Sequence, residues 1–323
     1  MAKTKQEKLD LKAEKLYYKT HKKKQHYTVK DIVFFILNYS FFGIFTLSCI
    51  FPFYYLFINT ISSNSLVRAG SITFIPKGIH LQNYIAMLGA EEVMTAFGVS
   101  ISRTIIGTAL MVATSALAGY LMTQQDLWHR KFWYRFLVIT MYFNAGLVPT
   151  YLNLLMLGLT ENYLVYILPA IVQPYNIILV KTYIESIPSE LEESAFIDGA
   201  GHMTIFRKII WPLSKPILAT IAIFGAVGHW NSFMDSIIYM SGTPELQTLQ
   251  HRLYIYLNQT SSLGAVVSGG VSGSQAAGMM EGVLDSKVIK YTISMVTVIP
   301  ILMVYPFMQR YFEKGIMLGA VKG

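Results

Sequence analysis

The sequence predicts an all-α integral membrane protein with six transmembrane helices. Of its 323 residues, 53% are hydrophobic and 14% are charged, and the mean hydropathy is +0.44, whereas a soluble domain carries about 25% charged residues. A helix needs roughly 20 residues to cross about 30 Å of hydrocarbon. Six windows of about this length or more contain no Asp, Glu, Lys or Arg: 32–67, 104–125, 136–160, 162–180, 216–234 and 291–309.

Basic residues are concentrated in alternate connections between the predicted spans. Most of the 26 Lys and Arg residues lie in 1–31, 123–135, 181–215 and 310–323. The positive-inside rule places such segments in the cytoplasm, so both termini are predicted to be cytoplasmic. The expected parts are a basic N-terminal segment 1–31, a six-span domain 32–309 with external loops 61–96 and 241–287 and a cytoplasmic loop 185–216, and a cytoplasmic tail 310–323.

The net charge of +8 does not indicate nucleic-acid binding, because it arises mainly from lysines that precede the first predicted span. Lys22, Lys23 and Lys24 are expected to contact anionic membrane lipid and to fix the orientation of that span. A seventh charge-free window, 253–280, is rich in glycine and serine over 261–282. Such a stretch loses much backbone entropy on ordering, so we predict a flexible external loop there and not a seventh span.

The sequence contains none of the motifs that mark the common catalytic sites. It has no phosphate-binding Gly-x-x-x-x-Gly-Lys loop, no His-Glu-x-x-His and no Gly-x-Ser-x-Gly, and its seven histidines are scattered. Cys49 is the single cysteine, so no disulfide forms within the chain. We therefore expect no enzyme activity, no metal site and no cofactor in this chain.

The cytoplasmic segment between the fourth and fifth windows has its own helix signals. Ser189 with Glu192 three residues later is a capping box, which predicts a helix start at Ser189. Gly199 and Gly201 predict a turn, and a second helix is expected over 202–211 before Pro212. Phe196, Ile197 and Ile205 have few obvious partners in the chain, which favours a docking surface for a soluble protein. A hairpin lying in the membrane interface is the alternative.

These residues resemble a known family. Glu193-Ser-Ala195, Asp198-Gly-Ala-Gly201 and Ile209-Ile-Trp-Pro212 are similar to the EAA loop of ABC importer permeases, Glu-Ala-Ala-x(3)-Gly-x(9)-Ile-x-Leu-Pro. Ser194 and Trp211 depart from that pattern. The segment is most similar to the carbohydrate, maltose-permease-type branch. Asn144-Ala-Gly-Leu-Val-Pro-Thr-Tyr151 and the C-terminal ten residues look like complex-oligosaccharide permeases of Gram-positive bacteria.

The resemblance implies a six-helix permease domain of the type I ABC importer kind, in the plasma membrane of a Gram-positive bacterium. The chain would pair with a second homologous permease, an ABC ATPase dimer that binds ATP and Mg, and an extracytoplasmic substrate-binding lipoprotein, and would pass an oligosaccharide. Gly269, Gly270 and Gly273, in the predicted external loop, would contact the binding protein. Coupling to the ATPase would fall on Glu193, Ser194, Ala195, Asp198, Gly199, Gly201 and Pro212.

Polar residues inside the predicted spans are the candidates for the substrate path, because burying them against lipid is costly. Their amide, carboxylate and aromatic groups suit a hydroxylated solute, although helix–helix hydrogen bonding is an equally open role for the amides. Asn231 and Asp235 are expected on one helical face, and Arg103 is expected as an interfacial anchor. The candidates are Tyr142, Asn144, Gln173, Asn176, Trp230, Asn231 and Asp235.

Two other functions stay open at this level. One is an ABC permease for another small polar solute, such as an amino acid or a phosphonate. The other is a secondary carrier driven by an ion gradient, which would need coupling carboxylates within the spans. Copurification of an ATPase distinguishes the carrier from both kinds of permease.

Overall fold

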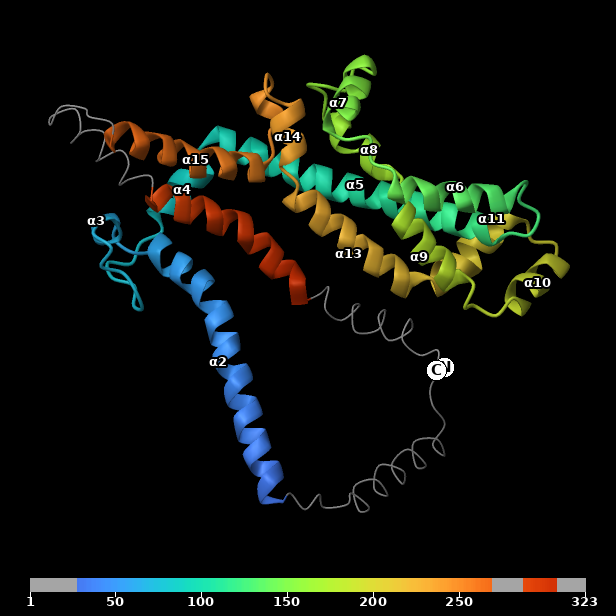
Figure 1. The fold of residues 1–323 in the computed structure, drawn as a ribbon, viewed down its shortest axis with the longest axis horizontal. Helices are drawn as coiled ribbons and strands as arrows, with labels where there is room; N and C mark the ends of the chain where they lie inside the picture. The colour runs from blue at the N-terminus through green and yellow to red at the C-terminus, as the bar shows by residue number, and fades with distance from the viewer. Residues whose placement is uncertain (1–27, 269–286, 307–323) are drawn as a thin grey trace. The chain divides into compact units, whose positions relative to one another are not determined.

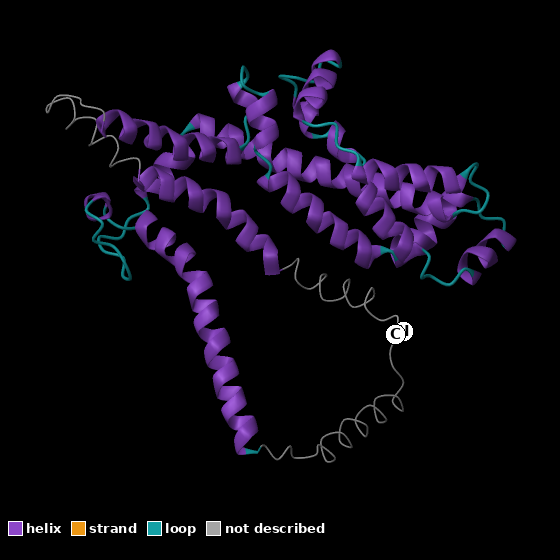
Figure 2. Ribbon diagram, viewed as in Figure 1, coloured by secondary structure: helices purple, strands orange, loops and turns teal. Residues whose placement is uncertain are grey.

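The computed structural model describes residues 28–268 and 287–306, and all regular secondary structure in these residues is helical (Figure 2). The chain divides into two units, Met1–Tyr54 and Tyr55–Gly323. The first unit contains most of α2 (Val29–Thr60). This helix starts with a reciprocal cap, in which Asp31 Oδ2 accepts from Thr28 N at 2.8 Å and Thr28 Oγ1 accepts from Asp31 N at 3.4 Å.

The second unit is built around one long helix, α5 (Glu91–Thr123). It packs along α13 (Lys215–Asn231) and α9 (Pro174–Ile184), and Figure 1 shows α13 running beside it. Glycines allow this close approach: a Cβ on Gly107 would lie 2.5 Å from the His229 ring, and one on Gly119 would lie 2.8 Å from Val180. Small residues at contacts are typical of helices that pack in membranes.

Three candidate spans of the structure are pairs of helical segments joined at a bend, and the third bend, at Ser214, precedes the predicted span 216–234. The first pair of segments is bent by 118°, the second by 42° and the third by 79°. The 136–160 window is therefore not one straight helix, because Gly146 adopts a positive φ of 84° between its two parts. Pro174 and Pro216 lie in the first turns of the helices that follow the other two breaks. The pairs are Arg130–Tyr142 (α6) with Leu147–Met156 (α7), Tyr163–Ile171 (η1, Tyr163–Tyr166, and α8, Leu168–Ile171) with Pro174–Ile184 (α9), and His202–Leu213 (α11 to α12) with Lys215–Asn231 (α13).

The described residues thus confirm the all-α membrane fold. Three helices are long and apolar enough to cross a membrane by length and composition, and up to six spans result if each bent pair is one span. The three unbroken helices are α2, α5 and the helix Lys287–Pro306. The six candidate spans follow one another along the chain in the same order as the six charge-free windows.

The segment that resembles the EAA loop folds into two short helical pieces. α10 (Glu190–Ile197) is followed by its C-cap Asp198 and then by Gly199, whose φ is +80°. A continuous helical run then follows, with α11 (His202–Ile205), a π-helical turn η2 (Phe206–Ile210) and α12 (Trp211–Leu213). The helix starts where the capping box predicts, but Ser189 makes no side-chain cap bond in this structure.

The predicted external loops contain helical elements, and one further short helix, α14, lies just before the second loop. These elements are α3 (Asn64–Arg68), α4 (Gln82–Gly89), α14 (Met234–Tyr239), η3 (Pro244–Leu246) and α15 (Leu249–Ser268). The prediction of a flexible loop from 261 is wrong as far as Ser268, because α15 continues through these residues. Gly269, Gly270 and Gly273 lie outside the described residues, as do segment 1–27 and tail 310–323.

Glu161, just before η1, forms hydrogen bonds with the turn that follows α14. Its carboxylate accepts from Thr243 Oγ1 at 2.5 Å and from Gly242 N at 2.9 Å. These hydrogen bonds, that of Thr243 first, lower the pKa of Glu161 below its usual value. The ionised carboxylate therefore fixes the turn after α14 against the start of η1.

We expect Gly119→Val to destabilise the α5–α9 contact. The added side chain would meet Val180 and the Lys181 backbone, at 2.8 and 3.1 Å from the new Cβ, and overpacking costs about 1–3 kcal/mol. The apparent melting temperature of the detergent-solubilised protein should fall by several degrees. Gly98→Val is the matched control on the same helix, since nothing lies within 4 Å of its Cβ position. Equal melting temperatures for the two variants would contradict this packing.

Candidate functional site

A cavity of about 470 Å³ lies among the helices of the second unit, between α5, α8 (Leu168–Ile171), α9, α13 and α14. This volume falls in the range of small-molecule sites, about 300–1,000 Å³. Most of the wall is apolar, including Met111, Leu154 and Phe224. A few polar side chains converge on it from separate elements: Arg103, Gln173, Asn176, His229 and Asp235.

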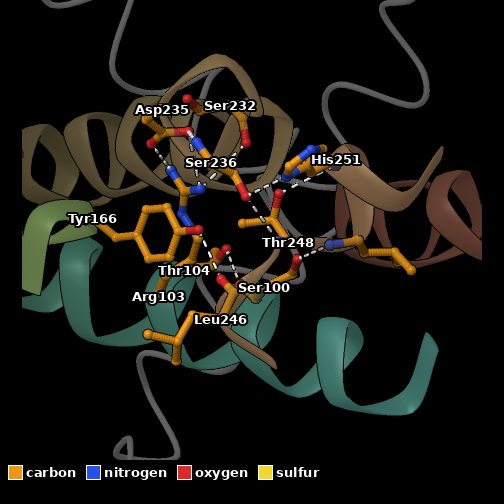
Figure 3. Close-up of polar contacts among 11 residues, drawn as sticks. Ser100, Arg103, Thr104, Tyr166, Ser232, Asp235, Ser236, Leu246, Thr248 and His251 are labelled. Atoms are coloured by element: carbon orange, nitrogen blue, oxygen red, sulfur yellow. Dashed lines mark hydrogen bonds and ion pairs between the residues drawn. The ribbon is translucent and has the colours of Figure 1, made fainter. Parts of the chain in front are cut away.

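An ion pair between the buried Arg103 and the partly exposed Asp235 lines this cavity (Figure 3). Arg103 NH2 lies 2.6 Å from Asp235 Oδ2, and Arg103 NH1 donates to Asp235 Oδ1 at 3.4 Å and to the Ser232 carbonyl at 3.3 Å. The guanidinium carbon also lies 4.4 Å from the centre of the Tyr166 ring, a cation–π contact. Arg103 is 1% exposed, so the prediction that it is an interfacial anchor is wrong.

The sequence does carry a signal for this pair. Arg103 is the one charged residue between Glu92 and Asp126, and Asp235 is the one charged residue between Lys215 and Glu245. Opposite charges that are each isolated in an apolar run are expected to pair in a membrane protein. The two residues are 132 positions apart, and nothing in the local periodicity connects them.

The hydrogen-bond network continues from the ion pair to the start of α15 (Figure 3). Ser236 Oγ lies 2.9 Å from His251 Nδ1 and accepts from Thr248 N at 3.2 Å. Leu249 N donates to Ser100 Oγ on α5 at 2.8 Å. Burial, followed by the neighbouring Arg252 charge, lowers the pKa of His251. The first turn of α15 is thereby fixed to both α5 and α14.

The remaining polar wall comes from α9 and α13. Gln173 and Asn176 lie at the start of α9, and Asn176 Nδ2 lies 3.1 Å from Met111 Sδ. His229 packs against Gly107, where an added Cβ would lie 2.5 Å from the ring. Amide, imidazole and carboxylate groups together offer both donors and acceptors, which is the set that binds hydroxyl groups.

Three of the seven candidates for the substrate path line this cavity: Gln173, Asn176 and Asp235. Trp230 does not line it. Its indole is buried, donates to the Thr297 carbonyl at 3.2 Å and meets the Phe97 ring edge-to-face at 6.2 Å. Trp230 therefore joins α13 to the helix Lys287–Pro306, a packing role.

The expected common face of Asn231 and Asp235 is not formed. α13 ends at Asn231, the chain is non-helical at 232–233, and α14 starts at Met234. Asn231 is exposed and accepts from Gln250 Nε2 at 3.4 Å, away from the ion pair. Tyr142 is 86% exposed at the end of α6, and Asn144 accepts from Gly146 N at 2.8 Å in the turn that follows.

A second set of candidates lies at the other end of α5. Glu193, Ser194, Asp198, Gly199, Gly201 and Pro212 are exposed, and Ala195 packs on a core that includes Ile205 and Phe206. Ile197 is 87% exposed and Phe196 is 40% exposed, as expected, whereas Ile205 is 0% exposed and does not belong to that surface. Gln124 Nε2 donates to Glu192 Oε2 at 3.2 Å, which links α10 to the end of α5.

Comparison with known proteins assigns the chain to a family. Residues 28–318 match the family described as "Binding-protein-dependent transport system inner membrane component". The chain belongs to this family of ABC importer permeases. It is accordingly a multi-pass membrane subunit of a transporter, without catalytic activity of its own. The match removes the ion-coupled carrier from the alternatives.

Individual relatives align with nearly the whole chain. The polygalacturonan/rhamnogalacturonan transport system permease protein YtcP of Bacillus subtilis (strain 168) is 34% identical over 91% of this chain and 100% of its own length. Protein LplC of the same organism is 32% identical over 92% of this chain and 98% of its own. A solved bacterial ABC transporter involved in import of the acidic polysaccharide alginate superposes with a TM-score of 0.76 and 30% identity, over 89% of this chain and 99% of that one.

We expect Gly228→Leu to block transport by filling the cavity. Gly228 lines the cavity, and nothing lies within 4 Å of its Cβ position, so the new side chain enters the open space without a backbone clash. Uptake of the solute in proteoliposomes should fall at least tenfold with an unchanged yield of protein. Gly98→Leu, on an open position outside the cavity, is the control. Normal uptake by the Gly228 variant would show that the solute does not use this space.

Proposed function

We propose that this chain is one permease of a heterodimeric ABC importer for oligosaccharides. The observation that carries the proposal is the cavity of about 470 Å³ whose apolar wall holds Gln173, Asn176, His229 and Asp235. Apolar and aromatic surface with a few amide and carboxylate groups is the chemistry that binds sugar rings. The names of YtcP and of the alginate transporter, both concerned with saccharide polymers, support this substrate class.

Coupling to a separate ATPase is proposed for the segment α10 to α12. The exposed Ile197 and Phe196 beside the exposed Glu193 give it an apolar surface with an acidic neighbour, suited to a protein partner. Its link to the end of α5, through Gln124 and Glu192, would carry movement of the partner into the helix that lines the cavity. ATP and Mg would bind to that partner. The second permease and a binding lipoprotein, the latter at Gly269, Gly270 and Gly273, complete the proposed assembly.

Transport assays on the assembled complex test the substrate class. The complex, reconstituted with its ATPase and binding protein, should take up pectin-type or neutral oligosaccharides in an ATP-dependent way. Amino acids and phosphonates should neither be taken up nor compete. Uptake of an amino acid or phosphonate without saccharide uptake would favour the alternative ABC permease and overturn the proposal.

Gly199→Val should uncouple the permease from its ATPase. Gly199 has a φ of +80°, which a β-branched residue adopts with difficulty, so the turn between α10 and α11 should be lost. We expect loss of ATPase copurification and at least a tenfold loss of uptake, and the same from Glu193→Lys. Gly98→Ala is the control, because nothing lies within 4 Å of its Cβ position and it is outside the segment α10 to α12. Retention of the ATPase by both the Gly199 and Glu193 variants would refute the docking assignment.

The proposed orientation, with both termini cytoplasmic, is tested by cysteine labelling. In a Cys49→Ser background, Glu245→Cys should react with an impermeant maleimide on intact cells, since Glu245 is exposed in a predicted external loop. Ser189→Cys should react only after the membrane is permeabilised. Labelling of the Ser189 variant on intact cells would reverse the topology.

A further inference from the structure

Arg103 lies where the α13–α14 break meets α5. Its NH1 donates to the Ser232 carbonyl at 3.3 Å, directly after the end of α13, and its NH2 lies 2.6 Å from Asp235 in the first turn of α14. A cation at the C-terminus of a helix satisfies carbonyls that have no partner within the helix. Arg103 therefore fixes the angle at which α14 leaves α13.

The two partners of the ion pair differ in their access to the cavity. The Arg103 side chain is 2% exposed and the Asp235 side chain is 25% exposed. The guanidinium is stacked on Tyr166, whereas the carboxylate faces the same space as Gln173, Asn176 and His229. Asp235 Oδ1 makes the longer of the two contacts with Arg103, at 3.4 Å, and also accepts from Ser236 N at 2.9 Å. Of the two partners, the carboxylate is therefore the more accessible to a hydroxyl group in the cavity.

The same pair is joined to α15 in two ways. Ser236, the residue after Asp235, contacts His251 and Thr248 through its hydroxyl group. Ser100, three residues before Arg103 and so on the same face of α5, accepts from Leu249 N. A shift of Asp235 would therefore be passed through Ser236 to the first turn of α15.

We propose that Arg103 is a positioning residue for transport. It holds the α13–α14 break so that Asp235 accepts a hydrogen bond from a hydroxyl of the solute. Through the hydrogen bonds of Ser236 and Ser100, this contact is also connected to α15. The proposal rests on the proposed function, passage of a polyhydroxylated solute through this cavity. A hydroxyl that donates to Asp235 competes with Arg103 for the carboxylate. Loading of the cavity is then transmitted to α15 by the weakening of one ion pair.

The decisive variant replaces both partners by apolar residues, Arg103→Met with Asp235→Leu. Exchange of a buried ion pair for well-packed apolar side chains is often neutral for stability. If the pair serves the fold alone, the double variant should assemble and transport normally. We expect it to assemble with its ATPase at near wild-type yield, while kcat/KM for saccharide uptake falls at least tenfold, chiefly through KM. Arg103→Lys, which keeps the charge, should retain uptake within about fivefold.

The control is the ion pair between Arg252 on α15 and Glu92 on α5, 3.0 Å apart, which does not line the cavity. Arg252→Met with Glu92→Leu should leave KM within twofold. If the Arg103 double variant fails to assemble, Asp235→Asn keeps the shape of the side chain and should still raise KM. A wild-type KM in either variant overturns the proposal.

The proposed function and this inference fail in different ways. Suppose that the wild-type complex takes up saccharide but KM is unchanged in the Arg103–Asp235 double variant or in Asp235→Asn. That result would remove the role of Arg103 and leave the oligosaccharide importer intact. Absence of saccharide uptake by the wild-type complex, with uptake of an amino acid in its place, would overturn the importer proposal and the hydroxyl contact at Asp235 together.

Discussion

The Arg103–Asp235 ion pair is the constraint on which the arrangement of the second unit depends. A charge at membrane depth is costly and has to be paired. Arg103 NH2 on α5 lies 2.6 Å from Asp235 Oδ2, just after the break between α13 and α14. The guanidinium also satisfies the Ser232 carbonyl and covers the Tyr166 ring. One side chain thus fixes the positions of α5, α14 and η1 around the cavity.

α5 connects this site to the segment proposed to bind the ATPase. Near its other end Tyr120 packs against Phe206 with ring centres 5.4 Å apart, and Gln124 binds Glu192 at 3.2 Å. A helix of 33 residues is about 50 Å long. Movement of α10 to α12 and movement of the cavity wall are therefore coupled through a single packed helix, whose glycines at 107 and 119 bring α13 and α9 into direct contact with it.

The sequence was sufficient for the fold class and for the turn at Gly199, because both depend on local signals. These signals are the long charge-free runs and the glycines at 199 and 201, the first of which has a positive φ in the structure. It was insufficient where tertiary contacts decide. Helical periodicity placed Asn231 and Asp235 on one face, but the chain leaves the helix at 232–233 and the freed carbonyl binds Arg103. Ile205 was assigned to an exposed surface, and its burial depends on α5 and α9 residues distant in sequence.

The two helix breaks beside the cavity explain why it lies there. Non-helical backbone at membrane depth is tolerated where protein or a polar cavity satisfies the freed groups. At the break before α9, the Ile171 carbonyl accepts from Thr114 Oγ1 at 2.6 Å, and at the break after α13 the Ser232 carbonyl accepts from Arg103. Both donors come from α5. The residues Gln173 and Ser232, which lie in these breaks, line the cavity. The interruptions that create the space are thus stabilised by the same helix that supplies its buried charge.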